Sequence, residues 1–99
     1  MEIPQSFDCV NRTYTVELHD SDNMDDHGEV DPKTAIIKLR ECTDMDFLEH
    51  TFIHECVHVV AGALGLEDID KDEAKVDAIA GVVHQIIKTA EGAILEDEN

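Results

Sequence analysis

Basic residues are scarce in this sequence. Its 99 residues include 7 lysines and arginines against 24 aspartates and glutamates, which gives a formal net charge of -17 at pH 7. A surface with this charge repels the phosphates of nucleic acids and the headgroups of anionic membranes. We therefore expect no direct binding to nucleic acids or membranes, and a basic protein is the partner that the charge favours.

Cysteines and long apolar stretches are also scarce. The three cysteines, Cys9, Cys42 and Cys56, are odd in number and match neither a disulfide framework nor a CxxC zinc site, so we expect free thiols in a reducing compartment. The first residues lack the basic and apolar segments of a signal peptide, and no apolar run reaches the roughly 18 residues of a membrane span. These absences predict a cytoplasmic protein, and the length fits a single domain over residues 1–99.

Two hairpins are expected in the first 40 residues. Alternating apolar residues predict two strands over residues 6–19, with a corner at residues 11–12, and an acidic loop follows over residues 19–29. A second hairpin is expected over residues 29–40, with a proline in its turn at residues 31–34, where no backbone N–H is needed. The buried face of the first hairpin is expected to hold Tyr14, Val16 and Leu18.

A long helix is expected to follow and to end at about Leu64. Thr43 is the expected N-cap, and Gly65 is expected to end the helix in the left-handed conformation. On a helical projection the two histidines of the helix centre, His54 and His58, fall on the side opposite the main apolar side, together with Glu55 and Ala61. The core side is expected to hold Leu48, Phe52, Ile53, Cys56, Val57, Val59, Val60, Ala63 and Leu64.

A second amphipathic helix is expected over residues 70–91, followed by a tail, residues 96–99, that frays. Together these elements predict an α+β fold: a small antiparallel or mixed sheet of three to four strands packed on the first helix, with the second helix at the C-terminus. The apolar side of the second helix is expected to hold Val76, Ile79, Ala80, Val83, Ile86, Ile87, Ala90 and Ile94.

The chemistry of the sequence is concentrated in the segment His54-Glu55-Cys56-Val57-His58. Two histidines four residues apart on a helix present their imidazoles on one side and can bind one metal ion, while the glutamate reaches the water that completes its coordination. A catalytic zinc site takes three protein ligands, and Glu73, at the start of the second helix, is the expected third. Asp77, one turn later, is expected to accept a hydrogen bond from a ligating histidine and fix its tautomer.

The pattern His54-Glu55-x-x-His58 followed by Glu73-x-x-x-Asp77 resembles that of the gluzincin metallopeptidases. The small size is similar to the minimal members of zincin-like fold, which are often encoded by phages or prophages and would act in the cytoplasm of a bacterial host. The resemblance implies that the two histidines and Glu73 bind one zinc ion and that Glu55 is the general base and acid of peptide hydrolysis. It also implies that an edge strand, for which residues 35–40 are the candidate, aligns a peptide or protein substrate.

Other functions and residue roles remain open from the sequence. The charge of -17 also suits an acidic, non-catalytic interaction protein, such as a DNA mimic, and a zinc ion could serve folding alone. His50 is expected on the surface, with a fourth-ligand role as the alternative, and His84 is expected to be partly exposed at the edge of a helix interface. Cys56 and Tyr14 are expected to be buried. A chain of this length has little room for specificity pockets, so a homodimer or another partner could complete the cleft.

Overall fold

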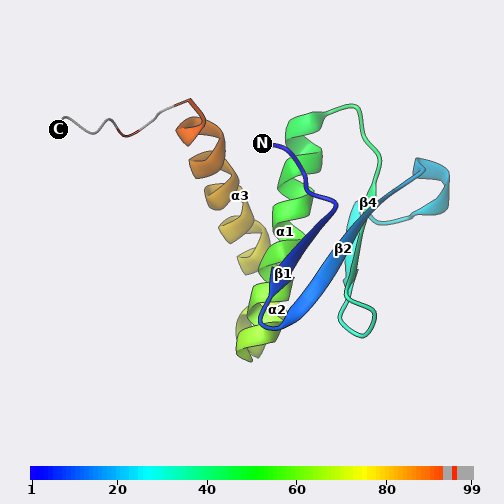
Figure 1. Ribbon diagram of the computed structural model, residues 1–99, viewed down its shortest axis with the longest axis vertical. Coiled ribbons are helices and arrows are strands. Elements are labelled where there is room, and N and C mark those ends of the chain that lie inside the picture. Colours follow the sequence, from blue (N-terminus) through cyan, green and yellow to red (C-terminus); the bar gives the residue numbers. More distant parts are fainter. Residues whose placement is uncertain (93–94, 96–99) are drawn as a thin grey trace.

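Both predicted hairpins are present, and they combine into one sheet that packs against helices (Figure 1). The computed structural model describes residues 1–92 and 95. Two predictions lie outside the described residues, namely the apolar packing of Ile94 and the fraying of the tail, residues 96–99. The α+β class is confirmed. The strands are β1 (Ser6–Cys9), β2 (Arg12–His19), β3 (Gly28–Asp31) and β4 (Ile36–Arg40), a 3-10 turn η1 spans Ser21–Asn23, and the helices are α1 (Met45–Leu64), α2 (Glu67–Asp70) and α3 (Glu73–Ala90).

The sheet is mixed, and its strand order is β1-β2-β4-β3. The two hairpins, β1–β2 and β3–β4, are antiparallel, whereas the central strands β2 and β4 pair in parallel, with Val16 beside Ile37. The edge strands are therefore β1 and β3. The expectation that residues 35–40 form a substrate-aligning edge is wrong, because parallel pairing with β2 places β4 in the middle of the sheet.

The turn of the first hairpin lies one residue earlier than expected. Cys9 pairs with Arg12, so the two turn residues are Val10 and Asn11, with φ of 45° and 64°. A two-residue turn with left-handed conformation at both positions matches the twist of the flanking strands. Asn11 tolerates this conformation, as predicted, while Arg12 belongs to β2 instead of the corner.

The ends of α1 are set by capping groups. The side chain of Asp44 accepts a hydrogen bond from the backbone N–H of Phe47 at 3.1 Å, so Asp44 is the N-cap and the expectation of Thr43 is wrong by one residue. At the other end Gly65 takes the left-handed conformation (φ 70°), and the N–H of Leu66 donates to the carbonyl of Ala61 at 2.8 Å. This C-terminal cap is the predicted one.

The second predicted helix is divided into two. The short α2 precedes α3, whose N-cap Asp72 accepts a hydrogen bond from the N–H of Lys75 at 3.2 Å, so the long helix begins at Glu73 and not at residue 70. Because an N-cap residue has an extended backbone, it ends one helical segment and fixes the direction of the next. Glu73 is consequently the first residue of α3.

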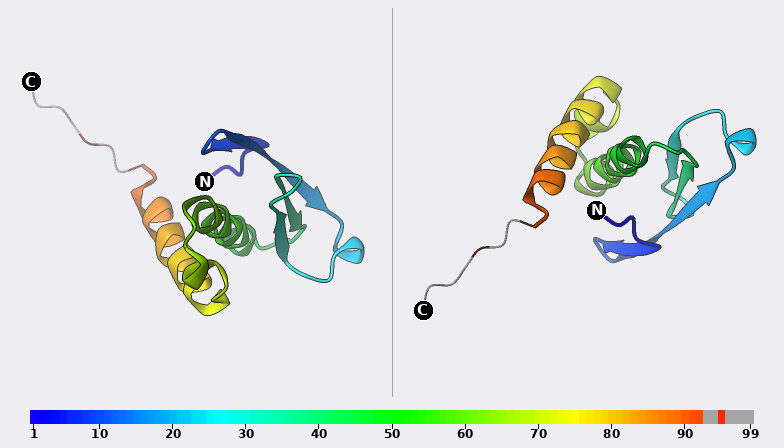
Figure 2. Two further views of the ribbon diagram at one scale, coloured as in Figure 1. Left: turned by 90° about the horizontal axis from the view of Figure 1, so that it is seen from below. Right: turned by 90° about the horizontal axis from the view of Figure 1, so that it is seen from above.

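Helix α1 lies between the sheet and α3, as both views of Figure 2 show. Ile37 and Leu39 of β4 are fully buried under one side of α1, and Val76 and Ala80 of α3 are fully buried on its other side. The prediction of a single core side for α1 is therefore partly wrong. On α1, Val60, Ala63 and Leu64 are exposed, whereas Glu55 and Ala61 are buried.

The expected apolar faces of the other elements are also only partly buried. Tyr14 is buried and Val16 is half-buried, but Leu18 is 60% exposed, because α1 covers β3, β4 and β1 and the end of β2 extends beyond it. On α3, Val76 and Ala80 are buried, whereas the large apolar residues farther from α1 are exposed; these are Ile79, Val82, Val83 and Ile86.

A glycine allows the edge strand β3 to approach α1 closely. A Cβ atom at Gly28 would lie 2.7 Å from Cγ2 of Thr51 and 3.3 Å from Oε2 of Glu55, whereas a Cβ atom at Gly62 would meet open space. We expect Gly28→Ala to reduce the free energy of unfolding by roughly 1–3 kcal/mol, because either the strand or the helix must shift.

Gly62→Ala is the matched control and should stabilise the protein by about 0.5–1 kcal/mol, since glycine within a helix is unfavourable. Urea unfolding monitored by circular dichroism measures both changes. Equal effects of the two substitutions would contradict the described approach of β3 to α1.

Candidate metal centre

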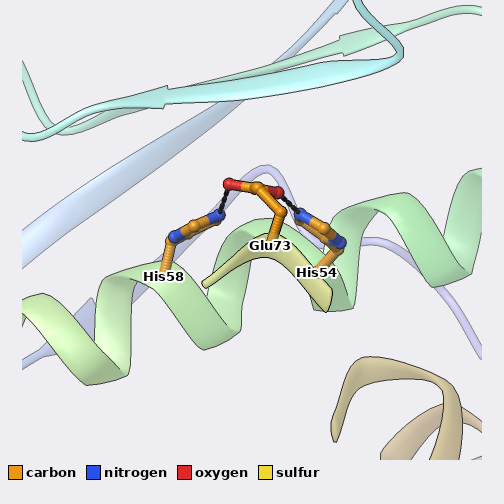
Figure 3. Close-up of side chains that lie close together, drawn as sticks. All are labelled: His54, His58 and Glu73. Carbon is orange, nitrogen blue, oxygen red and sulfur yellow. Dashed lines mark hydrogen bonds and ion pairs between the residues drawn. The ribbon is translucent and has the colours of Figure 1, made fainter. Parts of the chain in front are cut away.

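Three predicted metal ligands meet between α1 and the first turn of α3 (Figure 3). The Nε2 atom of His54 lies 2.9 Å from Oε2 of Glu73, and the Nε2 atom of His58 lies 2.8 Å from Oε1 of the same carboxylate. One donor atom from each of the three residues lies within 4.8 Å of the others. The group is therefore positioned to hold a metal ion.

Local sequence explains this arrangement. His54 and His58 are one turn apart on α1, so their side chains project from the same side. The glycine cap at the end of α1, the short α2 and the Asp72 cap then reverse the chain, and Glu73 emerges beside the two imidazoles. The histidines are mostly buried, with side-chain exposures of 17% and 13%, whereas the Glu73 side chain is 70% exposed.

Each histidine has a second carboxylate partner on its other ring nitrogen. Nδ1 of His54 lies 3.1 Å from Oδ1 of Asp77, which is the predicted contact, and Nδ1 of His58 lies 2.7 Å from Oδ1 of Asp70. Asp70 was not predicted as a partner of His58, because it was expected to be the first residue of the second helix and no pattern in the sequence pairs it with a histidine. An acidic residue within a short connection next to a histidine pair is the signal that could have indicated it.

These contacts show that the pocket between the rings suits a cation. A neutral imidazole has one N–H, so it cannot donate to carboxylates from both nitrogens at once. If the Nδ1–H groups of His54 and His58 donate to Asp77 and Asp70, the lone pairs of both Nε2 atoms are directed toward the Glu73 carboxylate. Either a second proton on each ring or a shared metal ion relieves that repulsion. Two imidazole nitrogens and one carboxylate oxygen form a donor set that zinc accepts.

Charge around His58 favours its protonated form when no metal is bound. Burial lowers the pKa of His58, but the hydrogen bond to Asp70 and the negative charges of Glu73 and Glu55 outweigh burial, so the pKa is raised above its usual value. A metal ion must displace this proton before the nitrogen can coordinate.

Glu55, the residue between the two histidines, is buried on the sheet side of α1 and has 6% exposure. It lies next to Gly28 of the edge strand β3. Burial raises the pKa of Glu55; the charges of His54 and His58 partly offset this rise, and those of Glu73 and Glu29 add to it. A carboxyl group that holds its proton more firmly than usual suits a general base that later acts as an acid.

A cleft of about 1050 Å³ runs along this side of the molecule. Gly28 and Val30 of β3 line one wall, while His54, Glu55 and Glu73 line the region of the candidate metal centre. The cleft therefore joins an edge strand, a possible metal centre and a buried carboxyl group.

The remaining candidates from the sequence lie outside the ligand group. His50 is half-buried; its Nε2 atom lies 3.2 Å from Oδ1 of Asp77, without hydrogen-bond geometry. Tyr14 is buried, as expected, and stacks on Phe7 with ring centroids 5.6 Å apart. All three cysteines are free; Cys56 is half-buried, and burial raises the pKa of its thiol to about 12.

A second cluster of possible ligands lies at the other end of the α1–α3 interface. Donor atoms of Asp46, Glu49 and His84 also lie within 4.8 Å of one another. However, Nζ of Lys88 lies 3.4 Å from carboxylate oxygens of both Asp46 and Glu49, and Nε2 of His84 contacts Glu49 at 2.9 Å. A lysine ammonium thus already supplies the positive charge. The hydrogen bond from His84 lowers the pKa of Glu49, which favours the ionised carboxylate. Because this buried group of α1 contacts His84 and Lys88 of α3, it links the two helices.

Comparison of the chain with protein-family models, with curated proteins and with solved structures found no match. In the part of the chain that the structure describes, no helix combines the length and the apolar composition needed to span a bilayer.

The contact between Asp70 and His58 leads to a prediction about metal affinity. Asp70→Asn should weaken zinc binding about 10- to 100-fold, because the carboxylate orients the imidazole and increases its basicity. Competition with a chromophoric chelator measures the affinity. Asp68→Asn, an exposed change on the same short helix, is the control and should bind zinc like the wild type. Equal affinities for all three proteins would contradict the proposed role of Asp70.

The buried carboxyl of Glu55 leads to a prediction about metal-free protein. Because its pKa is raised in the folded state, the folded state binds this proton more tightly than the unfolded state does, and stability should fall as the pH rises through that pKa. With a chelator present, Glu55→Gln should be more stable than the wild type at neutral pH and should make this fall smaller; the part of the fall that comes from His58, whose pKa is also raised, should remain. Urea midpoints of both proteins from acidic to neutral pH test this. Parallel pH profiles would show that burial does not perturb Glu55.

Proposed function

We propose that the protein is a zinc-dependent metallopeptidase with a zincin-like fold. In this proposal His54, His58 and Glu73 hold one zinc ion, and Glu55 transfers protons. The observation that carries the proposal is the convergence of both Nε2 atoms on the Glu73 carboxylate, at 2.9 and 2.8 Å, in a cleft that also contains a buried glutamate. The motif that resembles the gluzincin pattern supplies these same residues.

The residues of the site have separate roles in the proposed peptide hydrolysis. When bound, zinc supplies Lewis acidity, which activates water and polarises a carbonyl group. Glu55 takes a proton from the attacking water and delivers it to the leaving amine, and its raised pKa suits the second of these transfers. Asp77 and Asp70 hold the two imidazoles so that their Nε2 atoms face the centre.

The edge strand β3 supplies a place for the substrate. An edge strand has backbone N–H and C=O groups without a partner, and an extended peptide can pair with them. Gly28 brings β3 next to Glu55, so a peptide paired with the strand would pass the proton-transferring carboxyl. The substrate class that fits is therefore a peptide or protein segment in extended conformation, aligned by β3 instead of β4.

Metal analysis and hydrolysis assays together test this function. Protein purified without chelator should contain about one zinc ion per chain, and His54→Ala or Glu73→Ala should lose it. Glu55→Gln should keep the zinc but reduce cleavage of a fluorogenic peptide mixture at least about 100-fold, since a general base contributes roughly 10²–10⁴-fold.

His19→Ala is the matched control, because this histidine contacts Glu17 away from the centre, and it should change neither zinc content nor cleavage. Zinc content that is indifferent to His54→Ala and Glu73→Ala would refute the metal site. Zinc that depends on these residues without any cleavage would identify a metal-stabilised, non-catalytic domain, and a salt-sensitive basic partner would then support the acidic interaction protein.

A further inference from the structure

Helix α3 presents a side to solvent that carries no carboxylate. Of its four charged residues, Glu73 and Asp77 contact the histidines of α1, and Lys88 contacts Asp46 and Glu49. Only Lys75 remains on the opposite side, where its Nζ atom lies 3.9 Å from Oδ2 of the N-cap Asp72. We define the outer face of α3 by six exposed residues: Lys75, Ala78, Ile79, Val82, Val83 and Ile86.

The large apolar side chains of this face are exposed, and two of them, Val82 and Ile86, are exposed by more than half. Ile79 and Val83 are 39% and 36% exposed, and Val82 and Ile86 are 58% and 60% exposed. Among the described residues α3 packs mainly on α1 and α2, and Figure 2 shows it on the side of α1 away from the sheet. A continuous apolar stripe is uncommon on a monomeric surface and indicates a binding site.

Charge decides which partner this face fits. A basic protein would be recognised by carboxylates; the six residues of the outer face of α3 include none, and the nearby carboxylate of Asp72 is already paired with Lys75. Two copies of a chain with charge -17 repel each other, so the surface without unpaired carboxylates is the one on which they associate at the lowest electrostatic cost. We propose that the protein forms a homodimer in which the outer faces of α3 from two copies pack against each other.

Symmetry and charge together fix the arrangement of the two helices. A two-fold dimer brings the same surface of both copies together, so the contact must be self-complementary. If the two copies of α3 run antiparallel, Val82, near the middle of the helix, lies at the centre, and the two Lys75 residues lie on opposite sides of it, about 21 Å apart along the helix axis. A parallel arrangement would place the two lysines together. The antiparallel dimer also leaves both metal centres accessible, because Glu73 and Asp77 point to the other side of α3.

Sedimentation equilibrium of the wild-type chain at low and high salt tests the proposal. The expected mass is twice the 11.0 kDa of one chain, and the dimer should become tighter at high salt, because screening reduces the repulsion between two acidic copies. An association driven by opposite charges would instead become weaker.

Val82→Glu should shift the protein to the monomer and raise the dissociation constant at least about 100-fold, which corresponds to about 2.7 kcal/mol. Glutamate favours a helix more than valine does, so circular dichroism should show that the helix content is retained. Leu18→Glu is the matched control: it adds the same charge at a side chain that is 60% exposed on β2, and it should leave the dimer intact.

A wild-type chain that remains monomeric at every salt concentration would overturn the proposal and leave the face for a different protein. Equal weakening by Val82→Glu and Leu18→Glu would place the contact elsewhere. Neither result depends on zinc or on peptide cleavage, so the dimer and the proposed function can fail separately.

Discussion

The antiparallel contact between α1 and α3 is the interaction on which the candidate site depends. Val76 and Ala80 are the only fully buried apolar residues of α3 among the described residues, and much of the rest of the contact is polar. Histidines of α1 face Glu73 and Asp77 near the start of α3, and Glu49 faces His84 and Lys88 farther along. Because histidine–carboxylate pairs hold the start of α3 in place, binding of a metal ion there would also stabilise the packing of the two helices.

The side of α1 that faces the sheet carries the buried carboxyl group of Glu55, which the proposed hydrolysis also requires. Gly28 lets the edge strand β3 approach the helix, and Glu55 is buried at that point. The segment His54–His58 therefore contacts two neighbouring elements. Its histidines face α3, and Glu55 faces the sheet. This division gives the glutamate an environment that raises its pKa while the imidazoles remain close to their carboxylate partners.

Local patterns predicted much of the fold and part of the site. Alternation and turn residues indicated both hairpins, Gly65 marked the end of α1, and the four-residue spacing of His54 and His58 placed their rings together. Features that depend on distant parts of the chain were missed. The parallel pairing that makes β4 central, the burial of Glu55 under β3 and the contact of Asp70 with His58 all arise from tertiary packing, to which helical or strand periodicity is insensitive.

X-ray absorption at the zinc edge most directly tests the central claim that His54, His58 and Glu73 bind a single zinc ion. The account predicts a first shell of nitrogen and oxygen only, at about 2.0–2.2 Å, with the multiple scattering of two imidazoles. His58→Ala should remove the contribution of one imidazole. A sulfur shell near 2.3 Å, which would indicate cysteine ligands, or a spectrum that His58→Ala leaves unchanged, would contradict the account.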